Sequence, residues 1–529
     1  MKRFLTLLIV LRLLILVIVA FQGGFRTDPD AYRALAENLC DEYVFGNGDI
    51  PTAYRPPLYP ILLTPAVLAE RITGLPWMFD VIVVLFHGFL VVATITGSWR
   101  LADRLCVPAT VRGVSELMVG NGSVRGTFSD STIRWRLWIP PIAATLVALD
   151  PVLIRQSGLL MTETLATCLA VWLLIAGNPV VAGPRRFRRS LGVGGAYGLA
   201  ALCRPAFLPV AGVAALYFAW TGRKDRTGKI ASVCFLGATL LPLLIWGGRN
   251  LRELHRPILT TTHGGYTLLL GNQADFYAWV RGDQRRPWDA ASLQRELAVE
   301  FPFTGGIPLG MPDISGFRTA DMDTRAPGTH TPDTSEIPDI SGSPDTSIAS
   351  GPSEIFDGAP DTSERPDTEG TSDGAILTGP AVRRISVVSE LEMDARLRER
   401  AIIAIREDPT GFLRASAYRL RRFFGVVPYG TEPESVVRCM ARWGVVVYFV
   451  FCAVRGGVGV VGGIRCRVWT GDVDRWILCV TMVLTTVAIH SVYWTDIRMR
   501  SVIVPILAVV AAGGLVGLVS RRRWWRESP

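Results

Sequence analysis

Charged side chains are scarce in this chain: of its 529 residues, 19% are charged and 49% are hydrophobic, with a mean hydropathy of +0.32. Soluble domains carry about 25% charged residues, so the deficit argues against an ordinary soluble protein. The apolar residues gather in blocks of about 17–22 residues, the length that a helix needs to cross a bilayer. Only helices satisfy their backbone groups within such spans. We therefore expect an all-α polytopic membrane protein with about ten or more transmembrane helices.

Histidine and cysteine are also scarce, with five and nine residues respectively. The cysteines are scattered and form no C-x-x-C pair, which argues against a metal site and against a disulfide framework. His263 lies in a Gly-rich stretch with no second histidine or cysteine close to it in the sequence. A single histidine is a weak metal signal. The sequence therefore predicts no metal ligands, and a divalent cation stays open as a cofactor.

The net charge of +9 does not indicate nucleic-acid binding. Much of the basic excess lies in short clusters beside apolar blocks, which is the positive-inside pattern of membrane proteins. We expect membrane lipids as partners and no nucleic acid. The clusters are Lys2-Arg3, Arg134 with Arg136, Arg185-Arg186 with Arg188-Arg189, Arg223-Lys224 and Arg521-Arg522-Arg523.

The topology follows from these clusters. With Lys2-Arg3 inside, every basic segment falls on the cytoplasmic side and the long segment 248–440 falls outside. Arg12 interrupts the first apolar run and no A-x-A cleavage site follows it, so we expect an uncleaved first helix. The prediction is a multi-pass protein of the cell (inner) membrane with both termini cytoplasmic. The expected spans are about 4–21, 76–97, 137–153, 161–178, 191–203, 205–220, 230–247, 441–461, 476–493 and 501–519.

Two regions fit full spans poorly. Residues 57–72 are apolar, short and rich in proline, and we expect an interfacial or re-entrant segment. Residues 191–220 must hold two passes in about 30 residues, at 1.5 Å per residue. The alternative is two half-depth helices that break at Arg204-Pro205, because broken helices are tolerated where they line a cavity.

Three regions are expected along the chain. Residues 1–250 hold the N-terminal transmembrane helices and a catalytic first outer loop over 22–75. Residues 251–440 form an extracytoplasmic loop domain, and 441–529 hold the last transmembrane helices. Within the loop domain, 306–380 repeats a Pro-Asp-Thr/Ile-Ser unit and has too few apolar residues to fold, which predicts a disordered insertion. Residues 388–424 return to a helical pattern, and a second helix opens at Asp408-Pro409 and lies at the membrane surface.

The predicted topology brings polar residues that are distant in the sequence to the outer face. A carboxylate at such a depth is costly and usually functional. Sugar transfer from a lipid carrier would use this set well. One carboxylate would deprotonate the acceptor, and arginines would grip the departing phosphate with two donors each. The residues are Asp28, Asp30, Glu163, Arg204, Arg249, Asn250, Asp496, Arg498 and Arg500.

Each of these residues also has a plain structural interpretation. Asp30 fits the N-cap of a helix that starts at Ala31-Tyr32. Arg249 fits a membrane anchor that reaches toward the interface. Arg498 and Arg500 fit a pairing with Asp496. Glu163 is harder to explain in this way, because it enters an apolar span without a basic neighbour.

Several motifs resemble the integral-membrane GT-C glycosyltransferases, a group that includes the protein O-mannosyltransferases and the aminoarabinose–lipid A transferases. The resemblance rests on Asp28-x-x-x-Tyr32 and on Arg55-Pro56-Pro57-Leu58-Tyr59-Pro60. It extends over most of the chain outside 306–380. The further motifs are Met161-Thr162-Glu163, Leu202-Cys203-Arg204-Pro205, Arg249-Asn250, Gly264-Gly265-Tyr266 with Gly271-Asn272, and Tyr493 through Arg500.

The resemblance implies a polyprenyl-phosphate sugar donor, an inverting reaction, and a hydroxyl or amine acceptor on a protein, lipid or glycan that the sequence does not identify. It implies that the catalytic base lies four residues before a tyrosine, which selects Asp28 over Asp30. Glu163 matches the second acidic residue. The residues expected to bind substrate are Asp30, Tyr32, Arg55, Tyr59, Arg204, Arg249, Asn250, Arg498 and Arg500.

Two other functions compete with this one. A transporter or flippase of lipid-linked sugars would place charges on inward and outward routes near the midplane, whereas the acids here are expected at one face. A noncatalytic scaffold would leave Glu163 and the arginines without a role.

Overall fold

The computed structural model of the chain describes residues 2–107 without 23, 24, 26, 27 and 29, residues 137–282 without 182, and residues 380–425 and 473–527. Seven isolated positions, 293, 297, 439, 443, 444, 447 and 450, are also described. The predicted insertion over 306–380, except for its last residue, lies outside this part of the chain. So do the basic cluster of Arg134 with Arg136 and most of the predicted span 441–461.

Five helical segments are long and apolar enough to cross a membrane: α1 (Lys2–Phe21, of which Arg3–Phe21 qualifies), α4 (Trp77–Cys106), α12 (Arg226–Leu254), α20 (Val473–Val492) and Ile497–Val516. The last segment joins η3 (Ile497–Ile503) to α21 (Val504–Glu527). Two further helices, α9 (Glu163–Ala176) and α11 (Phe207–Gly222), are apolar but shorter. The described residues therefore have the helices of a multi-pass membrane protein, and the predicted number of ten or more spans is not confirmed.

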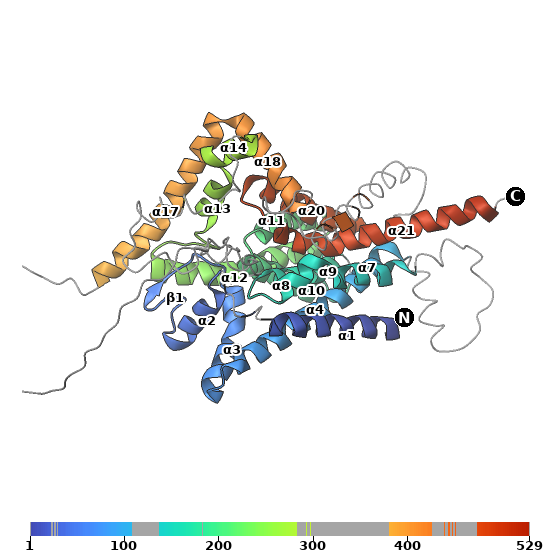
Figure 1. The fold of residues 1–529 in the computed structure, drawn as a ribbon, viewed down its shortest axis with the longest axis horizontal. Coiled ribbons are helices and arrows are strands. Elements are labelled where there is room, and N and C mark those ends of the chain that lie inside the picture. Colours follow the sequence, from blue (N-terminus) through green and yellow to red (C-terminus); the bar gives the residue numbers. More distant parts are fainter. Residues whose placement is uncertain are drawn as a thin grey trace, which may run out of the picture.

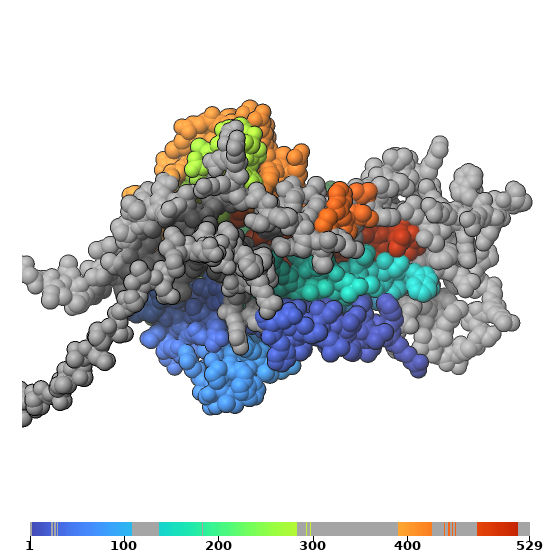
Figure 2. All heavy atoms as spheres, in the orientation of Figure 1, coloured from blue at the N-terminus to red at the C-terminus, as the bar shows by residue number. Residues whose placement is uncertain are grey.

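The long helices present apolar side chains on their outer faces. On α1, Leu7 is 68% exposed and Leu14 is 57% exposed. On α12, Val233 is 70% exposed and Ile245 is 67% exposed. Figure 2 shows α1 as an uncovered dark-blue row along the molecule. Contiguous apolar surface of this kind is rare on soluble monomers and fits contact with lipid.

The predicted span 137–153 is not one straight helix. It is divided into α7 (Ile139–Ala148) and α8 (Pro151–Ser157), which are bent by 52° and would make a sixth span if taken together. The bend has a local cause at Asp150. Its carboxylate accepts hydrogen bonds from the backbone of Val152 at 2.9 Å and Leu153 at 3.0 Å, and so starts a new helix.

The predicted break at Arg204-Pro205 is confirmed. Helix α10 (Arg186–Cys203) ends there and α11 begins at Phe207. Arg204 has extended backbone angles, with φ −147° and ψ 122°, because the ring of a following proline disfavours the helical conformation. The break holds the Arg204 side chain at a helix end inside the bundle.

Residues 30–76 form the segment that follows α1. Helix α2 (Tyr32–Asp41) is followed by a hairpin of β1 (Gly46–Asn47) and β2 (Ile50–Pro51), paired antiparallel. Helix α3 (Leu58–Thr73) comes next and buries Tyr59, Leu63 and Val67 on one face. It packs against α2 and α4.

A second group of helices covers one end of the bundle. It comprises α13 (Gly264–Gly271), α14 (Ala274–Arg281), α17 (Pro380–Glu407) and α18 (Pro409–Phe423). Helix α13 packs on α17, and α14 packs on α18. The contact is so close at Gly265 that an added Cβ would lie 2.1 Å from the carbonyl oxygen of Asp394. The predicted start of a helix after Asp408 is confirmed, since its carboxylate accepts from the Gly411 backbone at 2.7 Å.

Both ends of the chain lie at one end of the bundle, where α1 begins and α21 ends (Figure 1). The second group of helices lies toward the opposite end. The segments around α2, α9 and η3 meet between them and bring several buried charged side chains together.

Candidate active site

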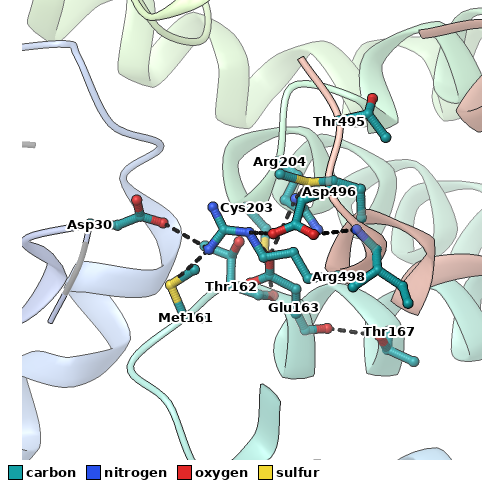
Figure 3. Close-up of polar contacts among 12 residues, drawn as sticks. Asp30, Met161, Thr162, Glu163, Thr167, Cys203, Arg204, Thr495, Asp496 and Arg498 are labelled. Atoms are coloured by element: carbon teal, nitrogen blue, oxygen red, sulfur yellow. Dashed lines mark hydrogen bonds and ion pairs between the residues drawn. The ribbon is translucent and has the colours of Figure 1, made fainter. Parts of the chain in front are cut away.

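Six charged residues meet inside the protein, and we call them the charge cluster: Asp30, Arg55, Glu163, Arg204, Asp496 and Arg498. Three carboxylates and three guanidinium groups are thus brought together from five separate segments. Figure 3 labels all of them except Arg55. Asp30 precedes α2 and Arg55 follows β2, while Glu163 is the first residue of α9. Arg204 lies at the α10–α11 break, and Asp496 and Arg498 lie at the start of η3. The convergence predicted from the topology is therefore present for all of these residues except Arg55, which the topology did not include.

Arg498 lies at the centre of the charge cluster. Its Nη1 is 3.9 Å from Asp30 Oδ2, and its Nε is 3.7 Å from Glu163 Oε1. The Nε is also 3.9 Å from Asp496 Oδ2. Arg498 therefore stands between the carboxylates (Figure 3) and makes no short contact with any of the three.

The two outer arginines differ in how tightly they are held. Arg55 Nη2 donates to Asp30 Oδ1 at 2.9 Å. Arg204 Nη2 is 3.6 Å from Glu163 Oε1 and 2.6 Å from the sulfur of Met499. Glu163 is 1% exposed, so this weakly paired carboxylate is withdrawn from water.

Several polar atoms of the charge cluster are buried without a hydrogen bond. Within the described part of the chain they include Glu163 Oε2, Arg204 Nη1 and Arg498 Nε. Buried polar groups are nearly always hydrogen-bonded, and an exception calls for an explanation. An anionic ligand between these residues would accept hydrogen bonds from the two arginine donors.

Asp30 is kept ionised by its neighbours. Burial acts to raise its pKa, but the guanidinium groups of Arg55 and Arg498 outweigh burial, and the pKa lies below its ordinary value. An opposite charge within about 4–6 Å favours the charged form of a carboxyl. The charge cluster therefore holds an ionised carboxylate beside two arginines.

Asp28 has a different environment. Its carboxylate accepts from the backbone N–H groups of Tyr32 at 2.8 Å and Arg33 at 2.7 Å, and so caps α2. Burial raises its pKa to about 6 in spite of these bonds. The interpretation of Asp30 as the N-cap is wrong: Ala31 occupies that position with a left-handed φ of 56°, and the capping carboxylate comes from Asp28. Asp28 makes no ion pair with the charge cluster among the described residues.

Tyr32 and Tyr59 pack beside the charge cluster, with their ring centroids 5.2 Å apart in an edge-to-face contact. The Arg55 guanidinium lies 5.9 Å from the Tyr32 ring. The Tyr59 hydroxyl lies 2.9 Å from His87 Nε2, and His87 Nδ1 lies 2.7 Å from the Ser157 carbonyl oxygen. Since the carbonyl can only accept, His87 donates from Nδ1 and accepts from Tyr59, whose proton is thereby engaged.

Three residues predicted to bind substrate are engaged elsewhere. Arg249 donates to the carbonyl oxygens of Thr52 at 2.9 Å and Phe45 at 2.8 Å. Asn250 donates to the carbonyl oxygen of Ile258 at 2.7 Å. Arg500 is buried and lies 3.3 Å from the Phe424 carbonyl oxygen. Arg249 therefore fixes the β1–β2 hairpin rather than acting as a membrane anchor, and the substrate-binding role of all three stays a prediction.

A small pocket opens beside Arg204 at the end of α10. It lies between the start of α11 and the helices α20 and η3, and its walls are mostly apolar. Its lining residues are Arg204, Ala206, Phe207, Val210, Thr486, His490, Met499 and Val502. One end of the charge cluster thus borders apolar side chains.

The other end borders two residues that the sequence did not single out as ligands. The Tyr54 ring lies 5.5 Å from the Arg55 guanidinium and 4.6 Å from the His263 ring. Tyr54 is next to Arg55 in the sequence, which is a local signal. The approach of His263 depends on a contact across more than 200 residues and has no local signal.

The carboxylates of the charge cluster do not form a cation site. Among the described residues, no group of three or more His, Cys, Asp or Glu side chains is arranged to hold a metal ion. Asp30, Glu163 and Asp496 each face a guanidinium group instead. The residues present therefore fit an anion better than a cation.

No family model matches the chain, and no curated protein matches it in sequence. A solved structure, "Archaeal oligosaccharyltransferase AglB from Archaeoglobus fulgidus in complex with an inhibitory peptide and a dolichol-phosphate", is similar to it with a TM-score of 0.43 and 13% sequence identity. The similarity covers 99% of this chain and 51% of that chain. The chain therefore spans about half the length of that solved structure.

Proposed function

We propose that this protein is a GT-C-type membrane glycosyltransferase that moves a sugar from a polyprenyl-phosphate carrier to a hydroxyl or amine acceptor at the outer face of the cell membrane. The observation that carries the proposal is the charge cluster, which places an ionised carboxylate beside arginines with unfilled donors in a buried site. The motifs that resemble GT-C enzymes supply several of its members. Both termini would be cytoplasmic.

The carrier phosphate would bind between Arg204 and Arg498. Arg204 Nη1 and Arg498 Nε are buried donors without a hydrogen bond in the described structure, and arginine can grip two phosphate oxygens at once. The apolar side chains around Arg204 would lie against the isoprenoid end of the carrier. Glu163 lies between the two arginines and would hold them in place before the carrier arrives.

The reaction would be a single displacement. The acceptor oxygen or nitrogen forms a bond to the anomeric carbon from the side opposite the phosphate, which inverts that centre. The bond from the anomeric carbon to the phosphate oxygen breaks, and its electron pair stays on the phosphate. The arginines stabilise the charge that builds there in the transition state, and the base takes the proton of the acceptor.

We infer that Asp30 is the base. It is ionised and lies within 3.9 Å of Arg498, which would place it close to the reacting centre. Asp28 is the residue favoured by its spacing from Tyr32, but its carboxylate already accepts hydrogen bonds from the backbone at the N-terminus of α2. Asp28 would then position the segment that carries Asp30.

The test is transfer from a labelled polyprenyl-phosphate sugar by the purified protein in detergent, where no compartments exist. Transfer to an added acceptor supports an enzyme, and no transfer under any acceptor condition supports the transporter or flippase. Asp30→Asn should lower the rate by about 10²–10⁴-fold, the usual contribution of acid–base catalysis. Asp28→Asn should lower it much less, because an asparagine also caps helices. The reverse order would assign the base to Asp28.

A further inference from the structure

Tyr54 and His263 form a buried polar pair at the end of the charge cluster opposite the Arg204 pocket. Tyr54 is fully buried, yet its hydroxyl has no hydrogen-bond partner in the described structure. The Nδ1 atom of His263 is likewise buried and without a partner there. Packing alone would be served by phenylalanine at both positions, so the two polar atoms need a separate explanation.

The pair is joined to the charge cluster through Arg55. The Arg55 guanidinium lies 5.5 Å from the Tyr54 ring and donates to Asp30 at 2.9 Å. The His263 ring meets the Tyr54 ring edge to face at 4.6 Å. A ligand held near Asp30 and Arg498 would therefore have Tyr54 and His263 on one side and Arg204 on the other.

His263 is neutral at physiological pH. Burial lowers its pKa to about 3, and the positive charges of Arg55 and Arg498 act in the same direction. A neutral imidazole has one donor and one acceptor nitrogen, and a tyrosine hydroxyl is both donor and acceptor. Such a pair matches alcohol groups, which also donate and accept, more fully than a phosphate, which only accepts.

We propose that Tyr54 and His263 form the subsite that hydrogen-bonds the ring hydroxyl groups of the donor sugar and so selects which sugar is transferred. This proposal rests on the proposed function and deepens it. The carrier would lie across the charge cluster, with its isoprenoid toward Phe207 and its sugar toward Tyr54. A site built to hydrogen-bond a hydroxyl discriminates strongly against an analogue that lacks it or points it elsewhere.

The test compares polyprenyl-phosphate glucose with the mannose and galactose compounds, each of which differs from glucose in the orientation of one ring hydroxyl. The quantity measured is the ratio of kcat/KM between the best of the three sugar donors and the other two. Tyr54→Phe keeps the ring and removes the hydroxyl, and it should reduce this ratio about tenfold or more. His263→Phe should reduce it as well, and His263→Asn, which returns a polar group near the Nδ1 position, should restore part of it.

Tyr277→Phe is the matched control, because the Tyr277 hydroxyl donates to Asn272 at 3.1 Å on the α13–α14 side and should leave the ratio unchanged. If Tyr54→Phe and His263→Phe slow all donors equally, the pair only supports the fold and the proposal is overturned. If the KM of the acceptor changes while the donor ratio stays constant, the hydroxyl belongs to the acceptor, which also overturns it. If the wild type transfers none of the three sugars and no lipid-linked pentose either, the proposed function has failed as well.

Discussion

Two buried polar centres lie close together in this protein, and they are built differently. The charge cluster has ion-pair separations of 3.6–3.9 Å at Arg204 and Arg498 and leaves buried donors unfilled. The second centre is formed by Glu390 of α17 with Thr52, Ala53 and Thr262, and we call it the Glu390 junction. Both Glu390 oxygens are filled there: Oε2 accepts from Thr52 at 2.8 Å, and Oε1 accepts from the Ala53 backbone at 3.3 Å and from Thr262.

This difference distinguishes a ligand-binding site from a contact that only stabilises the fold. A saturated centre has its polar groups satisfied by the fold and gains nothing from a ligand. The charge cluster would gain hydrogen bonds when an anion binds. The Glu390 junction holds Thr52 and Ala53, three and two residues before Arg55, so it ties the covering helix α17 to the segment that reaches Asp30.

The largest expected effect in this comparison is a lower kcat/KM for the lipid-linked sugar donor in Arg498→Lys. The charge is kept, but the two-pronged geometry of the guanidinium is lost. One charge-assisted hydrogen bond is worth about 1.5–3 kcal/mol, so kcat/KM for the lipid-linked donor should fall about 10- to 100-fold. Steady-state kinetics with a labelled donor in detergent measures this.

Arg249→Lys is its matched control, because Arg249 is saturated by Thr52, Phe45 and Asn250. It should lower the unfolding temperature while the KM of the donor stays near the wild-type value. Equal losses of kcat/KM in both variants would show that Arg498 in the charge cluster and the fully hydrogen-bonded Arg249 do not differ in function.

Next in size is the loss of stability in Glu390→Ala. The change leaves the Thr52 and Thr262 hydroxyls and the Ala53 N–H without their acceptor. An unsatisfied buried polar group costs about 1–3 kcal/mol, and we expect a free energy of unfolding lower by about 3 kcal/mol. Transfer by the folded fraction should stay within about tenfold of wild type, far above the rate of a variant that lacks its base. Thermal unfolding in detergent and the transfer assay together check this. A stable but inactive Glu390→Ala protein would place the Glu390 junction in the reaction.

The smallest effect concerns Asp28 and depends on pH. Burial raises its native pKa from 3.8 to about 6. Between these values the native state holds a proton that the unfolded state has released, so this group favours folding below about pH 4 and loses that contribution as the pH rises to about 6. Asp28→Asn removes the ionisation.

The unfolding temperature of Asp28→Asn relative to wild type should therefore be higher at pH 7.5 than at pH 4.5. Thermal unfolding of both proteins at the two pH values measures the difference. A constant difference would show that the pKa of Asp28 is not raised in the native state.

Sequence patterns alone indicated much of this arrangement. The apolar blocks and basic clusters placed the acids and arginines on one face. Arg204-Pro205 marked a helix break, because proline restricts the residue before it. The same patterns favoured Asp30 as the cap of the helix after it, whereas the capping carboxylate is Asp28. The difference depends on the left-handed turn at Ala31, which aims Asp28 at the backbone of α2.

Other features depend on packing between distant segments. Arg249 and Arg498 both follow or precede apolar spans and look alike in the sequence. Arg249 contacts backbone carbonyl oxygens beside the hairpin, and Arg498 contacts carboxylates. Only the folded chain brings those partners together. The contact between Tyr54 and His263 is of the same kind.

Binding of the carrier without its sugar tests the central claim most directly, because it separates anion recognition from catalysis. Native mass spectrometry of the purified protein with a polyprenyl phosphate would count bound carriers across a titration. We predict one carrier per wild-type protein, about tenfold weaker binding in Arg204→Gln and in Arg498→Lys, and unchanged binding in Glu390→Ala. Equal binding by wild type, Arg204→Gln and Arg498→Lys would contradict the assignment of the charge cluster as the phosphate site.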